Sequence, residues 1–200
     1  MIQLENILNI PKDGVYDFES IAKKLMRNFQ IKKEVEGKVQ FYYFTDIEFY
    51  YYGPGHEDQS VHPHFYTKPG QFRIHYSGVD ITLGVSWGGR EIDIQNDLKK
   101  KKKYSDNNKT LDFNQIKDYI TDDVKYGGIL LRGIKEKGKE YPINGPWRVL
   151  CELFHFEGTN FELGIIESQN EIVTFKSSPR TNLSDIAGNF KDKPYRFTVK

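Results

Sequence analysis

The feature that most constrains the fold is the run from Val39 to Tyr52, in which most residues are β-branched or aromatic. Such residues favour extended strands, because they pack well on a pleated surface. The run is long enough for one long strand or for a hairpin pair, and Gly53-Pro54-Gly55 ends it. A chain with this run is expected to build its core on a β-sheet.

Helical patterns lie on either side of this run. Asp17 to Phe29 predicts an amphipathic helix with Asp17 as its N-cap. Gly145-Pro146 opens a second helix that extends to about Phe154, with the proline well placed near the first helical position. A short helix is predicted over 114–120. The chain therefore combines a sheet with a few helices.

Further strands are predicted at 71–85, with an interruption at Ser77-Gly78, and at 127–133, 163–166, 172–175 and 195–199. The strand at 127–132 is expected at the centre of the sheet, because its apolar run has no polar face. We expect one mixed α/β domain over residues 1–200, with a curved, largely antiparallel sheet flanked by a few helices. No internal repeat or linker divides the chain.

Residues 88–110 have a different composition, with five lysines at 99–103 followed by Ser105-Asp106-Asn107-Asn108. We interpret the segment as a mobile surface excursion. The lysine run fits a solvated loop, and it also fits a loop that contacts phosphates.

The bulk composition excludes several classes of protein. Cys151 is the one cysteine, so a disulfide within the chain and a cysteine zinc site are excluded. The first residues lack a basic and apolar leader, and no stretch approaches the roughly 18 apolar residues of a membrane span. We expect a cytoplasmic protein without a membrane partner. The net charge of +1 gives no overall nucleic-acid footprint, although a local basic face can coexist with it.

The first candidate site is Asp46-Ile47-Glu48-Phe49-Tyr50. Side chains alternate along a strand, so Asp46, Glu48 and Tyr50 share one face. Two acids on one face of an apolar strand are costly to bury. In a partly dry site, one acid beside another has a raised pKa and can serve as a general base. The alternative is an exposed face on which the acids are inert.

Histidines and aromatic residues gather after this strand. His56, His62, His64 and His75 could include metal ligands, proton-handling groups or ordinary loop residues. The aromatic residues of this region either pack in the core or form a site that sandwiches a flat base. They are Tyr50, Tyr51, Tyr52, Phe65, Tyr66, Phe72 and Tyr76. Because phosphate-binding glycine loops and a serine nucleophile elbow are both absent from the sequence, an ATPase, a hydride-transfer enzyme and a serine hydrolase are not supported.

The order of the motifs resembles the 3-methyladenine (alkyladenine) DNA glycosylase family over roughly residues 15–200. The motifs that carry the resemblance are Ile21-Ala22-Lys23-Lys24-Leu25-Met26, Asp46-Ile47-Glu48-Phe49-Tyr50, Gly53-Pro54-Gly55-His56-Glu57-Asp58, Phe72-Arg73-Ile74-His75-Tyr76-Ser77-Gly78, Gly128-Ile129-Leu130-Leu131-Arg132, Asn144-Gly145-Pro146-Trp147-Arg148-Val149-Leu150-Cys151, Ser178-Pro179-Arg180 and Lys193-Pro194-Tyr195-Arg196-Phe197.

The resemblance implies release of alkylated purines from DNA by hydrolysis of the N-glycosidic bond. Glu48 falls on the water-activating glutamate and Tyr50 on an aromatic that stacks on the flipped base. His62 is the nearest candidate for the pocket histidine, with His56 and His64 as alternatives. Further substrate contacts are expected from Asp46, Phe72 and Tyr76, and phosphate contacts from Arg132, Arg180, Lys101 and Lys102.

The resemblance also implies DNA as partner, a monomer, and neither cofactor nor metal. Two positions depart from the family pattern. Ser77 stands where a tyrosine wedges into DNA, and Gly84 stands where a pocket asparagine is expected. The alternative function is a base- or nucleotide-binding module of the same fold, non-catalytic or of altered specificity.

Overall fold

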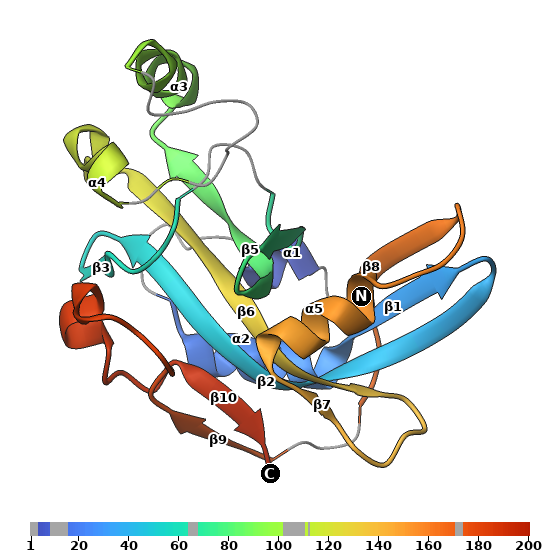
Figure 1. Cartoon of the computed structure of the whole chain (residues 1–200). Helices are drawn as coiled ribbons and strands as arrows, with labels where there is room; N and C mark the ends of the chain where they lie inside the picture. Colours follow the sequence, from blue (N-terminus) through green and yellow to red (C-terminus); the bar gives the residue numbers. More distant parts are fainter. Residues whose placement is uncertain (1–3, 9–15, 64–67, 102–110, 112, 171–173) are drawn as a thin grey trace.

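The computed structural model describes residues 4–8, 16–63, 68–101, 111, 113–170 and 174–200. It contains one open antiparallel sheet with strands in the order β4-β5-β6-β2-β1-β8, to which β3, β7, β9 and β10 are attached (Figure 1). The strands are β1 (Phe29–Val35), β2 (Lys38–Gly53), β3 (His56–Glu57), β4 (Phe72–His75), β5 (Gly78–Trp87), β6 (Val124–Glu136), β7 (Ile143–Asn144), β8 (Phe161–Glu167), β9 (Phe175–Ser178) and β10 (Arg196–Val199). The helices are α1 (Leu4–Leu8), α2 (Phe18–Asn28), α3 (Glu91–Lys100), α4 (Phe113–Ile116) and α5 (Pro146–Phe154), with short 3-10 turns at Lys117–Tyr119 and Asp185–Phe190. The predicted mixed α/β fold with a largely antiparallel sheet is confirmed.

The aromatic run forms one long strand, β2, rather than a hairpin pair. Its first part pairs with β1 on one side, its middle pairs with β10 on that same side, and β6 follows it on the other side. Strand β6 lies between β2 and β5, so the prediction of a central 127–132 strand is confirmed. Because β2 has neighbours on both sides, its backbone groups are satisfied while its side chains point to two different faces.

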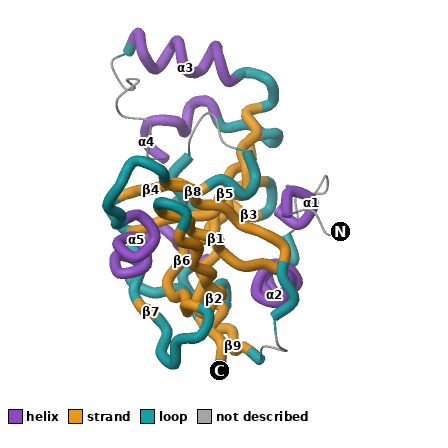
Figure 2. The backbone as a smooth tube through the Cα atoms, turned by 90° about the vertical axis from the view of Figure 1, so that its right-hand side faces the viewer, coloured by secondary structure: helices purple, strands orange, loops and turns teal. Residues whose placement is uncertain are grey.

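The two faces of the sheet are covered by different helices. Figure 2 shows α2 and α5 on opposite sides of the sheet. Helix α2 begins at the predicted cap, where the Asp17 carboxylate accepts a hydrogen bond from Ser20 N at 2.9 Å. Its buried side packs on the face of β2 that carries Phe49 and Tyr51, with the Phe18 ring stacked on Phe49. The opposite face, which carries Asp46, Glu48 and Tyr50, is available for a site.

Helix α5 and the α3–α4 region cover the two ends of this second face. Helix α5 begins at Pro146, as predicted, and packs on β5 and β6. At the other end, the rings of Tyr52, Trp87 and Tyr126 form a separate apolar cluster with the helices α3 and α4. The stretch of sheet between these two packed ends is left uncovered by any helix among the described residues.

A one-residue bulge in β5 makes this arrangement possible. The pairing with β6 shifts between Thr82 and Val85, and Gly84 within the bulge has a φ of +87°. A bulge changes which residues face each side, so Thr82 and Trp87 point to the same face although their numbers differ in parity. The alternation of a regular strand would have sent the Trp87 ring to the other side.

The lysine-rich segment contains a helix that the sequence pattern did not reveal. Helix α3 buries Ile94 and Leu98, which lie one helical turn apart, against the second apolar cluster. Lys101 follows the helix, and Lys102 and Lys103 lie outside the described residues. None of the described helices is long and apolar enough to cross a membrane.

Candidate functional site

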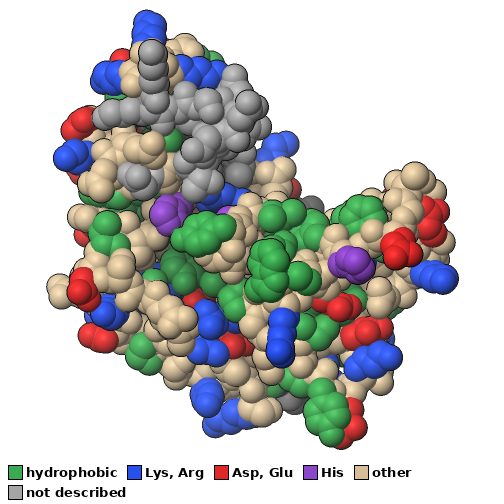
Figure 3. All heavy atoms as spheres, viewed as in Figure 1, with side chains coloured by type: hydrophobic (Ala, Val, Ile, Leu, Met, Phe, Trp, Pro, Cys, Tyr) green, Lys and Arg blue, Asp and Glu red, His purple; other side chains and the backbone are tan. Residues whose placement is uncertain are grey.

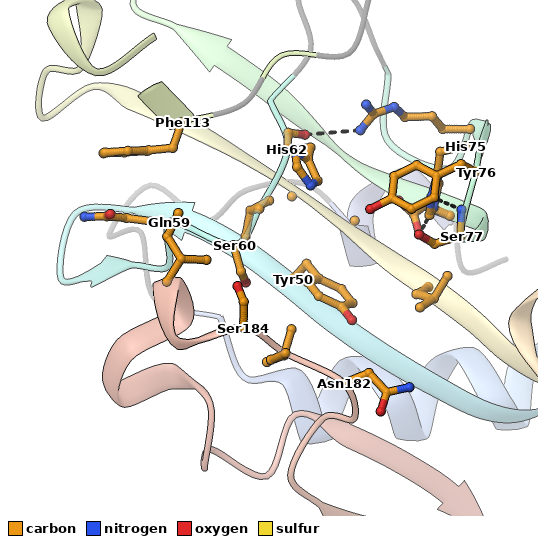
Figure 4. Close-up of a pocket in the computed structure, with 18 of the residues that line it drawn as sticks. Tyr50, Gln59, Ser60, His62, His75, Tyr76, Ser77, Phe113, Asn182 and Ser184 are labelled. Atoms are coloured by element: carbon orange, nitrogen blue, oxygen red, sulfur yellow. Dashed lines mark hydrogen bonds and ion pairs between the residues drawn. The ribbon is translucent and has the colours of Figure 1, made fainter. Parts of the chain in front are cut away.

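A cavity of about 400 Å³ lies on the uncovered stretch of the sheet. It is lined by Tyr50, Gln59, Ser60, Val61, His62, Arg73, His75, Tyr76, Ser77, Asp80, Thr82, Phe113, Asn114, Gly127, Gly128, Leu130, Asn182, Leu183, Ser184 and Ile186. Figure 4 shows the Tyr50 ring in its middle, with Asn182 and Ser184 on one side and His75, Tyr76 and Ser77 on the other. Figure 3 shows apolar side chains gathered over this face of the molecule. The volume is in the range of small-molecule sites.

Three neighbouring strands form the floor of the cavity. Tyr50 of β2 lies opposite Gly128 of β6, which lies opposite Thr82 of β5. Gly128 carries no side chain, so a space opens directly beside the Tyr50 ring. A flat ring could stack here on the aromatic face of Tyr50. The sheet therefore supplies a platform for a planar ligand.

Glu48 lies next to Tyr50 on the same face and is completely buried. Its Oε2 accepts a hydrogen bond from the Tyr50 hydroxyl at 2.9 Å, and its Oε1 accepts from Thr181 N at 3.1 Å. Arg132 contacts both oxygens, with Nε 3.3 Å from Oε1 and Nη1 3.4 Å from Oε2. Glu48 does not itself line the cavity, and the Tyr50 hydroxyl is its connection to it. The burial of this acid is compensated by an arginine and by hydrogen-bond donors.

Asp46 has a different role from the substrate contact expected of it. Its two oxygens accept hydrogen bonds from Nε and Nη2 of Arg196, at 3.0 and 2.6 Å, and Thr198 adds a third donor at 3.2 Å. Arg196 also reaches Glu48 Oε1 at 3.9 Å. Asp46 is buried and does not line the cavity. The carboxylate thus anchors β10 against β2.

The predicted pocket histidines are separated by the fold. His62 lines the cavity, and its Nδ1 lies 3.3 Å from the carbonyl oxygen of Leu111. His56 lies outside the cavity, with Nδ1 2.9 Å from the Tyr51 carbonyl oxygen and Nε2 3.0 Å from the Tyr195 hydroxyl. His64 lies outside the described residues. Of the three candidates, His62 is the described one that lines the cavity.

His75 and Asp80 form a polar edge of the cavity, and no motif in the sequence marks them as a pair. They face each other across the β4–β5 hairpin, with Nε2 3.1 Å from Oδ1. Arg73 on the same edge donates a hydrogen bond to the His62 carbonyl oxygen. Arg73 and His75 alternate along β4, and Asp80 lies opposite Arg73 on β5, so the pairing of the hairpin puts all three on one face. The sequence does not indicate that this edge of the hairpin borders Tyr50.

The remaining aromatic candidates that the structure describes divide between the cavity and the core, and Phe65 and Tyr66 lie outside the described residues. Tyr76 lies at the cavity rim and is 86% exposed. Phe72 points the other way, packing against the main core near Phe154. Ser77 lines the cavity, whereas Gly84 lies in the β5 bulge away from it. Of the residues expected at the base, the structure brings together Tyr50, His62 and Tyr76.

The basic residues predicted to contact phosphates also differ in their surroundings. Arg180 is buried and forms an ion pair of 2.6 Å with Asp58. Arg132 is tied to Glu48 and keeps 16% of its side chain exposed. Lys101 is half-exposed and pairs with Asp97 at 2.7 Å, and Lys102 lies outside the described residues. Burial removes Arg180 from any surface that a phosphate could reach.

Among the described residues, no group of three or more His, Cys, Asp or Glu side chains is arranged to hold a metal ion. The buried acids of the site are instead matched by arginines: Glu48 by Arg132, Asp46 by Arg196 and Asp58 by Arg180. Each of these buried carboxylates thus has a cationic partner from the chain itself.

The surroundings of His56 predict a pH-dependent stability. Burial lowers the pKa of this histidine from its ordinary value of 6.5. Below about pH 6.5 the unfolded chain therefore takes up a proton that the folded chain resists, so stability is lost on acidification. The free energy of unfolding in urea should fall more steeply from about pH 7.5 to about pH 5.5 in the wild type than in His56→Gln. Equal slopes for the two proteins would show that His56 does not contribute.

The chain matches no known protein-family model, and no curated protein shows significant similarity to it.

Proposed function

We propose that the protein hydrolyses the N-glycosidic bond of a damaged purine in DNA, as a divergent relative of the alkyladenine DNA glycosylases. The observation that carries the proposal is the pairing of a planar platform with a buried acid. Tyr50 lines the cavity opposite Gly128, and its hydroxyl donates to the carboxylate of Glu48. A purine extruded from the duplex would stack on Tyr50, as base-flipping enzymes require.

In this proposal Glu48 activates water and offsets the positive charge that develops on the sugar. A carboxylate beside a glycosidic bond can do both, since the transition state resembles an oxocarbenium ion. Glu48 itself has no exposed surface, so in this proposal the water would approach along Arg132, which holds both carboxylate oxygens and keeps 16% of its side chain exposed. The mechanism needs no cofactor and no metal. Asn182, Ser184 and His62 would contact the edges of the base.

A second candidate is a module that binds a base or nucleotide without cleaving it. It is favoured by the complete burial of Glu48, whose two oxygens already have partners. A general base must come within hydrogen-bond reach of the water that it activates. In the binding module, Glu48 would serve only to fix the Tyr50 ring.

The test is a base-release assay. The protein is incubated with duplex and single-stranded oligonucleotides that carry 3-methyladenine, 7-methylguanine or hypoxanthine, and strand cleavage at abasic sites is measured after alkali. Release of any of these bases supports hydrolysis. Tight binding without release supports the second candidate, and neither binding nor release excludes both.

The DNA-binding contribution of α3 can be tested through its salt dependence. Lys100 is exposed on this helix, whereas the Lys101 ammonium is held by Asp97 at 2.7 Å and by the Tyr119 hydroxyl at 3.1 Å. If α3 contacts phosphate, Lys100→Gln should reduce the slope of log affinity against log salt by about 1, and Lys101→Gln by less. Affinity for a labelled duplex measured over a salt series checks this. Unchanged slopes in both variants would assign the lysines to a solvated surface.

A further inference from the structure

Asp58 and Arg180 form an ion pair in the interior, and both side chains have no exposed surface. The guanidinium also donates to the carbonyl oxygens of Phe49 at 3.3 Å and Phe190 at 3.1 Å. Removing two charges from water is costly, and apolar residues of similar volume often stabilise a fold equally well. Stability alone therefore does not explain why charges stand here.

The guanidinium of Arg180 supports the ring that forms the cavity floor. Its Cζ lies 4.7 Å from the centre of the Tyr50 ring and 5.7 Å from that of Tyr195. Tyr50 lines the cavity and Arg180 does not, so the guanidinium packs against Tyr50 from the side away from the cavity. A cation over an aromatic face is attracted to it, most strongly where water is excluded. Together with the hydroxyl bond to Glu48, this contact fixes both the position and the plane of the ring.

The same ion pair connects the two loops that wall the cavity. Asp58 Oδ1 accepts hydrogen bonds from Ser60 N at 3.0 Å and Ser60 Oγ at 2.6 Å, which sets the course of the lining residues 59–62. On the other side, Thr181 follows Arg180 directly and is bonded to Glu48, and the lining residues 182–184 come next. The Tyr50 ring, the loop 59–62 and the loop 181–184 are therefore all held by the contact between Asp58 and Arg180.

We infer that Asp58 and Arg180 are positioning residues of the cavity, which hold the Tyr50 ring and the loops 59–62 and 181–184 in the geometry that receives a planar ligand. The inference rests on the proposed function only for the choice of ligand. The pair itself touches no ligand. Its role is to pre-organise the groups that do, which lowers the cost of binding.

The experiment compares the double variant Asp58→Leu/Arg180→Met with the wild type. Both charges are removed together, because a single substitution would leave a buried charge without its partner. The matched control is Lys33→Met, which removes another buried cation. The Lys33 ammonium donates to the carbonyl oxygens of Glu152 and His155 and lies away from the cavity. Thermal unfolding curves of all three proteins are measured first, so that the readouts are taken at a temperature at which each protein is folded.

Two readouts are taken. The first is the NMR signature of the Tyr50 ring, assigned by its loss in Tyr50→Phe. The second is the affinity for an oligonucleotide with one 2′-fluoro-deoxyinosine, whose glycosidic bond resists hydrolysis. In the double variant the Tyr50 signals should shift and the ring should flip faster, and affinity should fall about 10- to 100-fold. In Lys33→Met neither readout should change, whatever the change in stability.

Unaltered Tyr50 signals in a folded double variant would overturn the inference, as would affinity within about twofold of the wild type. If the wild type fails to bind the oligonucleotide, the proposed function fails. The Tyr50 spectrum then still decides the inference, since it requires no ligand.

Discussion

Replacing Glu48 by glutamine is expected to reduce base release by roughly 10²–10⁴-fold, the usual loss when a general base is removed. The side chain keeps its shape, but it no longer carries the charge that activates water. Ground-state binding of the damaged oligonucleotide should change less, because the platform is formed by Tyr50 and Gly128. The effect should therefore fall mainly on kcat.

The same substitution is also expected to destabilise the fold. Glu48 accepts from Thr181 N, from the Tyr50 hydroxyl and from Arg132, so an amide must turn its NH₂ toward at least one donor. Arg132 also loses its counter-charge. Breaking such a buried pair costs about 3–5 kcal/mol. Turnover must therefore be measured at a temperature where the variant is folded.

Asp46→Asn is the matched control for this experiment. Asp46 lies on the same face of the same strand, is buried, and is paired with Arg196 as Glu48 is with Arg132. The control should lose stability for the same reason and retain most of its turnover. Glu48 is bonded to the hydroxyl of Tyr50, which lines the cavity, whereas the hydrogen-bond partners of Asp46 are Arg196 and Thr198, which do not. Single-turnover rates and urea unfolding of both variants give the comparison. Full activity in Glu48→Gln would remove the catalytic assignment and leave the binding module as the better account.

The two adjacent glycines of β6 should respond in opposite ways to alanine. A Cβ at position 127 would lie 2.5 Å from the Tyr50 carbonyl oxygen, which belongs to the backbone and cannot easily move. A Cβ at position 128 would meet only Asp80, at an ordinary 3.5 Å. We expect Gly127→Ala to cost about 1–3 kcal/mol as an overpacked substitution. Gly128→Ala should leave the stability nearly unchanged or slightly higher.

Ligand binding should be affected more by substitution of Gly128 than by substitution of Gly127. The methyl group of Gly128→Ala enters the space beside the Tyr50 ring, so ligand binding should fall, and Gly128→Leu should abolish it by filling the floor. Gly127 also lines the cavity, but a Cβ at this position would point toward the Tyr50 carbonyl oxygen and Leu83, on the face opposite to that of the Gly128 Cβ. Gly127→Ala should therefore affect binding only as far as it unfolds the protein. Urea unfolding and oligonucleotide affinity, measured on the three variants together, separate the two effects. Normal binding by a folded Gly128→Leu variant would show that the ligand does not lie on this floor.

The fold class could be read from the sequence, because it depends on local patterns. The β-branched and aromatic run specifies a strand, the Asp17 cap and the Pro146 start fix two helix ends, and the apolar run around Leu130 requires a buried strand. Alternation along β2 also placed Asp46, Glu48 and Tyr50 on one face. These features are decided by residues close together in the chain.

The bulge in β5 could not be predicted from these local patterns. The shift at Gly84 turns Trp87 toward the cavity side of the sheet, and with it the cluster that closes one end of the uncovered stretch. A bulge depends on how two strands meet, so a glycine in a strand indicates only that one could form. The helix at Glu91–Lys100 was hidden for a related reason, since its buried Ile94 and Leu98 are few among many charges.

The residues close together in the chain therefore specify which side chains share a strand face and where helices begin. The pairing of buried charges depends on contacts between distant segments. Strand β10, about 150 residues further along the chain, brings Arg196 opposite Glu48 and onto Asp46, and the segment before it buries Arg180 beneath Tyr50. The periodicity of the sequence indicates the direction of a side chain. The free energy of burying a charged side chain depends instead on its neighbours, which come from distant parts of the chain. For that reason Arg180, which the sequence placed on a DNA-binding surface, lies inside the protein behind the ring that forms the cavity floor.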